Sequence, residues 1–144
     1  YRYLLQSSEK PLIPLSEELA FIKAYYFLLK TRFDERLLLD IYVGNEIAQQ
    51  MIPPLTLQIL LENAVKHNII SQETPLHIVI SEVNSNKVVI SNTLQRRAQS
   101  VVSTQTGLAN LAAKYQLMQQ PGPEIFETQD KFSVQITLLP NQAS

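Results

Sequence analysis

The sequence predicts an α+β domain that is preceded by a helical segment. The domain is expected to be a two-layer sandwich, with a mixed, mostly antiparallel sheet and helices packed on one face. Three observations lead to this class. Apolar residues recur every three or four positions in three stretches, as amphipathic helices require. In the stretches between them, apolar residues alternate with polar ones, which is typical of half-buried strands. The order of these stretches gives one sheet with helices on one side.

Composition agrees with a single core and excludes several classes of protein. The 144 residues are 45% hydrophobic and 17% charged, which are ordinary globular values. A formal net charge of -1 gives no electrostatic basis for binding nucleic acid, and the absence of cysteine excludes disulfides and cysteine metal sites. No apolar run reaches the roughly 18 residues of a spanning helix. Because the sequence starts at Tyr1 and not at Met, we expect a part of a longer protein, with any membrane anchor upstream.

The first long helix is expected from Leu15 to Phe33, after the end of another helix over residues 1–6 and an interruption at Pro11 and Pro14. Ser16 is its expected N-cap. The helix carries two apolar stripes, one of six residues (Leu15, Leu19, Ile22, Tyr26, Leu29 and Phe33) and one of three (Phe21, Tyr25 and Leu28). Two stripes suggest contact with its own domain and with another subunit. In the alternative, both stripes belong to the core.

The strands follow from alternation, and the connections from their polar composition. Apolar residues alternate over residues 37–43 and again over 76–80, with a turn at 83–86 and a return strand over 87–91. Residues 92–106 are polar and without a period, so we expect a loop. Pro121-Gly122-Pro123 precedes a final hairpin, whose inward residues are Phe132, Val134, Ile136 and Leu138.

The helix between these strands carries the candidate chemistry. Pro53 and Pro54 favour a helix start. One face is apolar, with Leu57, Leu60, Leu61, Ala64 and Val65 at helical spacing. Asn63, Lys66 and His67 lie three and four residues apart and are expected to share another face. An amide oxygen can ligate Mg²⁺, and the two basic side chains can meet phosphate. The pattern fits a metal-nucleotide site, although an ordinary solvent-exposed helix has the same spacing.

A second element of the site is expected at Gly107, where the polar loop meets the next helix. A helix start offers free N–H groups and the positive end of a dipole to a phosphate. Glycine allows the backbone to approach a ligand closely. One glycine alone is weak evidence, so this site depends on its position after the candidate helix.

Several motifs, in order, resemble LytS-type sensor histidine kinases, of the superfamily that groups gyrase, heat-shock chaperone, histidine kinase and mismatch-repair ATPases. The matching segments run through nearly the whole chain: Ile52-Pro53-Pro54 with Leu61-Glu62-Asn63-Ala64-Val65-Lys66-His67-Asn68 (the N-box), Leu15-Ser16-Glu17-Glu18-Leu19 before it, and Thr106-Gly107-Leu108-Ala109-Asn110-Leu111 after it. The resemblance implies the ATP-binding catalytic domain of a two-component kinase, with ATP and Mg²⁺ as cofactors. It divides the chain into the end of a dimerisation region (1–33) and the catalytic domain (34–144).

Under this resemblance each site residue has an expected role. Asn63 would ligate Mg²⁺, Lys66 and His67 would address phosphates, and Glu62 would orient water or the metal. The segment with Gly107, Leu108 and Asn110 would close over the nucleotide. Ile59 stands where the hydrolytic members place a glutamate, which favours phosphoryl transfer over hydrolysis.

Two departures from the family pattern weaken the expected adenine site and lid. Ser91 stands where an aspartate is expected and Thr93 where a glycine is, so Ser91 and Asn92 would form a weakened adenine clamp. In the glycine-rich segment only Gly107 is present.

The expected partners lie outside this chain. The only two histidines, His67 and His77, do not resemble an acceptor, so the histidine that receives the γ-phosphate is expected on a helix upstream. The resemblance implies a response regulator, a homodimer, and a cytoplasmic domain of an inner-membrane sensor. Two alternatives remain: a degenerate nucleotide domain that acts as a dimerisation or interaction module, and a serine kinase of the anti-sigma-factor type.

Overall fold

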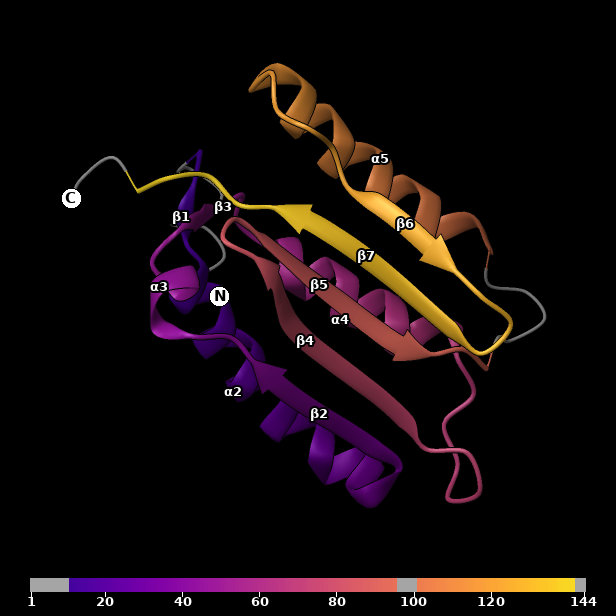
Figure 1. The fold of residues 1–144 in the computed structure, drawn as a ribbon. Coiled ribbons are helices and arrows are strands. Elements are labelled where there is room, and N and C mark those ends of the chain that lie inside the picture. The colour runs from indigo at the N-terminus through magenta and orange to yellow at the C-terminus, as the bar shows by residue number, and fades with distance from the viewer. Residues whose placement is uncertain (1–10, 96–100, 142–144) are drawn as a thin grey trace.

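The chain folds into one layer of helices packed against one face of a sheet (Figure 1). The structure, a computed structural model, describes residues 11–95 and 101–141. The elements are β1 (Ile13–Pro14), α2 (Leu15–Phe33), a short 3-10 helix η1 (Asp34–Arg36), β2 (Leu37–Tyr42), α3 (Asn45–Ala48), β3 (Met51–Ile52), α4 (Thr56–His67), β4 (Leu76–Asn84), β5 (Lys87–Thr93), α5 (Val101–Leu117), β6 (Glu124–Glu127) and β7 (Lys131–Thr137).

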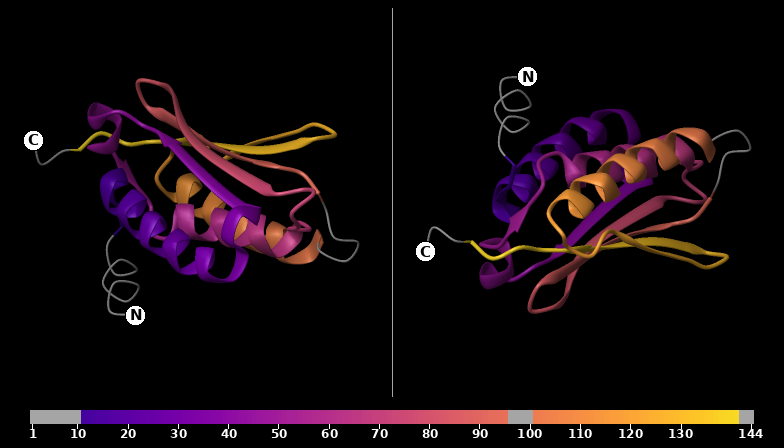
Figure 2. Two further views of the ribbon diagram at one scale, coloured as in Figure 1. Left: turned by 90° about the horizontal axis from the view of Figure 1, so that it is seen from below. Right: turned by 90° about the horizontal axis from the view of Figure 1, so that it is seen from above.

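The main sheet has five strands in the order β2-β4-β5-β7-β6, and only the β2–β4 pair is parallel. Strands β1 and β3 form a separate antiparallel pair. Seen edge-on, α2, α4 and α5 all lie on the same side of the sheet (Figure 2). The predicted α+β class and the single helical layer are therefore confirmed. The short elements β1, α3, β3 and η1 were not predicted, because two to four residues are too few to show a period.

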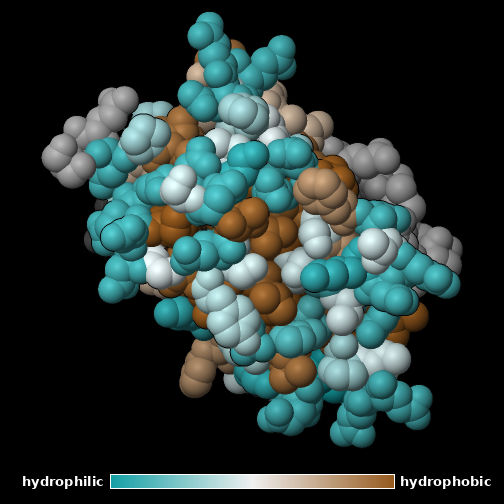
Figure 3. Space-filling model, in the orientation of Figure 1, coloured by the Kyte–Doolittle hydropathy of each residue, from teal (hydrophilic) through white to brown (hydrophobic). Residues whose placement is uncertain are grey.

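Strand register separates the inner face of the sheet from the outer one. Ile80 of β4 pairs with Ile90 of β5 within the buried core, and Ile78 faces the same side, whereas their neighbours along each strand point to the other side. The outer face carries the hydrogen bond between His77 Nε2 and Asp40 Oδ2, at 2.7 Å. Figure 3 shows this face, with apolar atoms near its centre surrounded by hydrophilic residues.

Helix α2 belongs to the same hydrophobic core as the sheet. Four residues of its first predicted stripe are buried (Leu15, Leu19, Ile22 and Phe33), and two are partly buried (Tyr26 and Leu29). The second stripe is divided: Phe21 and Tyr25 are half-buried and stack on each other, whereas Leu28 is 65% exposed. The expected domain boundary at residue 33 therefore does not divide this core. The assignment of residues 1–33 to a dimerisation region stays a prediction. The expected helix over residues 1–6 lies outside the described residues.

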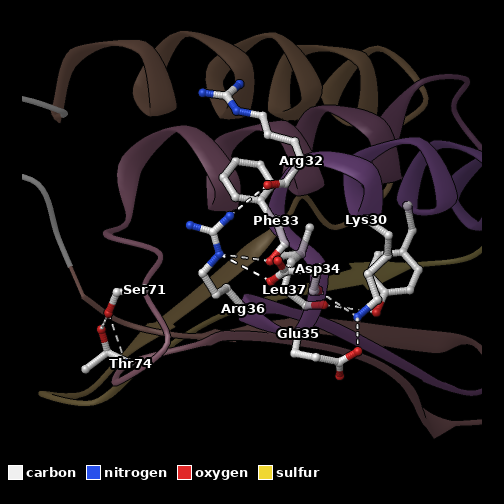
Figure 4. Close-up of polar contacts among 10 residues, drawn as sticks. Lys30, Arg32, Phe33, Asp34, Glu35, Arg36, Leu37, Ser71 and Thr74 are labelled. Atoms are coloured by element: carbon white, nitrogen blue, oxygen red, sulfur yellow. Dashed lines mark hydrogen bonds and ion pairs between the residues drawn. The ribbon is translucent and has the colours of Figure 1, made fainter.

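At the junction between α2 and β2, basic side chains donate hydrogen bonds to backbone carbonyls (Figure 4). Arg36 donates through Nη2 to Arg32 O at 2.7 Å and through Nε to Phe33 O at 3.0 Å. Lys30 Nζ donates to Asp34 O at 2.7 Å, where Asp34 has a φ of 46°. These bonds satisfy carbonyls that the end of a helix leaves unpaired. At the other end of α2 the expected cap is wrong: Pro14 is the N-cap residue, and Ser16 lies exposed inside the helix.

Tyr115 connects α5 to the sheet, and its removal gives a first testable prediction. Its side chain is fully buried, its hydroxyl donates to Thr137 O at 2.5 Å, and burial raises the pKa of the phenol above its usual value. We expect Tyr115→Phe to lower the free energy of unfolding by about 1 kcal/mol, because a buried carbonyl loses its donor. Urea denaturation measures this. The control Tyr42→Phe, at a side chain that is 62% exposed, should change it by less than about 0.5 kcal/mol. Equal effects would contradict a role for the hydroxyl.

Candidate functional site

The helix with the candidate chemistry, α4, starts after a sharp change in backbone direction. Pro53 and Pro54 are buried, and Leu55, the N-cap residue, has a φ of 69°. Thr56 Oγ1 donates to Pro53 O at 2.7 Å. The first free N–H groups of α4 are bound by a residue of α2: Glu18 accepts from Leu55 N at 3.2 Å and from Leu57 N at 3.0 Å. The predicted apolar face is confirmed, with Leu57, Leu60, Leu61 and Ala64 buried and Val65 half-buried.

The two flanks of α4 face different helices. On the flank toward α2, Glu62 Oε1 accepts from Gln58 Nε2 at 2.9 Å. Burial raises the pKa of Tyr25 in α2, and the nearby Glu62 carboxylate raises it further. On the other flank, a Cβ added to Gly107 of α5 would lie 3.0 Å from Ile59 Cγ2 and 3.6 Å from Asn63 Nδ2. The structure thus brings Asn63 and Gly107 together, and it turns Glu62 toward α2.

Asn63 carries an unsatisfied polar atom at this contact. Its Nδ2 is buried and has no hydrogen-bond partner among the described residues. Buried polar atoms are nearly always paired, so this nitrogen is available to donate to an acceptor that binds beside it. Asn63 therefore lies where a bound group would meet an unpaired amide, next to a helix that approaches closely because Gly107 has no side chain.

Lys66 and His67 do not present one exposed surface together with Asn63. Lys66 is exposed, whereas His67 is only 9% exposed. The cause is the angular position on α4, since His67 follows the buried Leu60 and Ala64 by seven and three residues. The three side chains of the predicted shared face therefore differ in exposure: the ammonium of Lys66 is exposed, the amide of Asn63 is half-buried and the imidazole of His67 is buried.

The start of α5 differs from the prediction. The helix begins at Val101, six residues before Gly107, so Gly107 does not open it. An N–H inside a helix bonds to a carbonyl four residues back, and Gly107 therefore offers no free N–H to phosphate in this conformation. Leu108 packs in the core at 9% exposure, and Asn110 is exposed. Among the expected lid residues, Gly107 is the one that the structure places beside Asn63 of α4. Residues 96–100 of the predicted loop lie outside the described residues.

Strand register also separates the two residues of the expected adenine clamp. Asn92 pairs with Ile78 and Phe132, and so faces the helices. Ser91 pairs with Val79 and Ser133 on the outer face, since consecutive residues of a strand point to opposite sides. The two residues therefore do not share one face of the sheet, and the expected adenine clamp stays a prediction. Asn92 is buried at 7% exposure, and its Nδ2 donates to Thr93 O at 2.7 Å.

Sequence reasoning missed the role of Asn68, which follows α4 directly. Asn68 is 3% exposed; its Nδ2 donates to Ala64 O at 2.8 Å and its Oδ1 accepts from Gln95 N at 2.7 Å. Ile69 N donates in turn to Gln95 O at 2.7 Å. Asn68 thus ties the end of α4 to the chain that leaves β5 three residues after Asn92. Its place as the last residue of the N-box was the only signal in the sequence.

The residues present fit Mg²⁺ that arrives with a nucleotide better than Mg²⁺ alone. Within residues 11–95 and 101–141, no three His, Asp or Glu side chains come together in a way that could hold a metal. Mg²⁺ in nucleotide sites commonly uses one or two protein oxygens together with substrate phosphates and water. Asn63 can supply one such oxygen.

Within residues 11–95 and 101–141, none of the helices has the length and apolar character of a membrane span.

Comparison with known sequences gives three concordant findings. A family model described as histidine kinase matches residues 1–37. The sensor protein LytS of Bacillus cereus is 37% identical over 67 residues, which is 46% of this chain and 11% of that protein. The sensor histidine kinase/phosphatase LytS of Staphylococcus aureus is 29% identical over 101 residues, 70% of this chain and 17% of that protein. The chain thus spans less than a fifth of the length of these relatives.

Solved structures show the same fold. The cytoplasmic segment of histidine kinase QseC has a TM-score of 0.60 at 14% identity, over 90% of this chain and 78% of that one. The nucleotide-free catalytic domain of histidine kinase ThkA has a TM-score of 0.56 at 11% identity, over 90% and 99%. Full-length ShkA in complex with AMPPNP has a TM-score of 0.53 at 16% identity, over 90% and 32%. Together with the sequence matches, these findings support a LytS-type histidine kinase with an ATPase-like domain.

Proposed function

We propose that this part of a LytS-type sensor histidine kinase binds Mg²⁺-ATP between α4, α5 and the inner face of β5, and presents the γ-phosphate to a histidine upstream. The observation that carries the proposal is the place of Asn63 beside Gly107, where a buried amide nitrogen without a partner among the described residues can donate to a phosphate oxygen. The ShkA neighbour, which has the same fold, is in complex with AMPPNP.

Two side chains of α4 have defined tasks in the proposal. Asn63 would hold Mg²⁺ through its amide oxygen, and the metal would supply positive charge to the phosphates. Lys66, exposed one turn further along α4, neutralises a phosphate from solvent. Phosphoryl transfer depends mostly on positioning and charge, so the site needs no nucleophile of its own. The nucleophile is the imidazole of the acceptor, which a separate helix has to deliver.

The direct test is calorimetric titration of this chain with AMPPNP in the presence and absence of Mg²⁺. We expect saturable binding that depends on Mg²⁺. Absence of heat at all nucleotide concentrations, in a chain shown by circular dichroism to be folded, would contradict the proposal.

Asn92 and Ser91 provide a matched pair of variants for the adenine end of the site. We expect Asn92→Ala to weaken AMPPNP binding by about tenfold, since it removes a buried polar group on the helix side of β5. Ser91→Ala removes a side chain of the outer face and should leave the affinity unchanged, because the sheet separates it from α4. The same titration measures both. A larger loss with Ser91→Ala would place the adenine on the wrong side of the sheet for this proposal.

One observation favours the second candidate, a nucleotide domain that has become an interaction module. With α5 already helical from Val101, the N–H of Gly107 is inside the helix and not at its start. Phosphate binding through that segment then requires its first turns to unwind. Amide exchange over residues 101–107 with and without AMPPNP distinguishes the two candidates: slower or faster exchange with ligand supports the kinase, and no change supports the module.

A further inference from the structure

The Glu18 carboxylate is buried in the first turn of α2, on the same side as the buried Leu15 and Leu19. The residue is 1% exposed, whereas its neighbour Glu17 is exposed. Glutamate is rarely buried unless its charge is compensated. The compensation comes from α4: Oε2 accepts from Leu55 N at 3.2 Å, and Oε1 accepts from Leu57 N at 3.0 Å.

The start of α4 has no cap of its own. Leu55 is its N-cap residue, has a φ of 69° and makes no side-chain cap bond. Glu18, from a helix that starts about forty positions earlier in the chain, takes this role. Because Glu18 also lies in the first turn of α2, one carboxylate faces the positive ends of two helices. The two helices are therefore tied at the same end.

The same two helices also pack against each other beyond this end. Leu19 and Ile22 of α2 and Leu60 and Leu61 of α4 are buried in one hydrophobic core, where the two helices lie side by side. Close-packed side chains oppose sliding of one helix past the other. Asn63 follows these residues on α4, so the packing of the two helices holds the candidate metal ligand in place.

We infer that Glu18 is a positioning residue for the nucleotide site, and that α2 and α4 move as one body. A shift of α2 then moves Asn63 relative to Gly107 and changes nucleotide affinity. The inference rests on the proposed function, because it assigns a positioning residue to the same site.

The test compares Glu18→Gln with the matched control Glu17→Gln, which removes the same charge from the same turn of α2 at an exposed position. In Glu18→Gln an amide NH₂ replaces one oxygen and opposes a backbone N–H. Two quantities are measured at a temperature where circular dichroism shows both variants folded: the affinity for AMPPNP with Mg²⁺, and the exchange rates of the α4 amides. We expect Glu18→Gln to lower the affinity about tenfold relative to the control. Amide exchange should rise along α4 as far as Asn63.

Two outcomes overturn the inference: an affinity equal to that of the control, or faster exchange confined to Leu55 and Leu57. Either would make Glu18 a local cap that stabilises the fold only. If the wild-type chain binds no nucleotide, the proposed function fails, and the extent of exchange along α4 alone decides the coupling. If Glu18→Gln does not fold, Glu18→Asp replaces it with the same readouts. This variant keeps the charge but shortens the reach to α4.

Discussion

Asn63→Ala is expected to abolish Mg²⁺-dependent binding of AMPPNP while leaving the protein folded. The amide oxygen is the candidate metal ligand, and without it the metal loses its link to α4. The stability should change by less than about 0.5 kcal/mol, since Asn63 is half-buried and its Nδ2 has no partner to lose among the described residues. Titration calorimetry measures the binding, and urea denaturation measures the stability.

A matched control separates the loss of this amide from the loss of any amide. Gln116→Ala removes an exposed side-chain amide from α5, and it should retain the affinity of the wild type. Asn63→Ala with unchanged affinity at saturating Mg²⁺ would exclude Asn63 as the ligand. A fall in affinity that is equal with and without Mg²⁺ would assign Asn63 to the nucleotide instead of the metal.

The sequence predicted the elements whose periods are long enough to read. The apolar spacing of Leu57, Leu60, Leu61 and Ala64 places α4 with its buried face toward the sheet, as the structure has it. The alternation over β4 and β5 identifies both strands, since their core residues follow a period of two. These patterns are local, and local pattern suffices where burial repeats regularly along the element.

What the sequence could not give is the spatial relation between elements. Ser91 and Asn92 are adjacent in the sequence, but the register of β5 puts them on opposite faces. The carboxylate of Glu18 satisfies N–H groups 37 and 39 residues away, and no local pattern encodes such a contact. The start of α5 was missed for another reason: residues 92–106 are polar and show no period, so the first six residues of the helix were expected to belong to a loop.

Phosphate transfer provides the most demanding test of the proposed kinase. We expect no phosphate incorporation when this 144-residue chain is incubated alone with labelled ATP and Mg²⁺. His77 lies on the outer face of β4, where its Nε2 bonds to Asp40 Oδ2 at 2.7 Å, so the sheet separates it from Asn63. His67 is 9% exposed on α4 itself, four residues from Asn63, and its backbone cannot bring it in line with a phosphate held by the same helix.

A longer chain that restores the upstream sequence should become labelled on a histidine there, with the acid lability of a phosphoramidate. The same longer chain with Asn63→Ala should remain unlabelled, because transfer requires the metal-bound nucleotide that α4 holds. Acid-labile label on His67 or His77 in the short chain would contradict the assignment of the acceptor. A long chain that is folded but neither binds AMPPNP nor becomes labelled would instead favour the interaction module, because the domain would then keep its fold without binding a nucleotide.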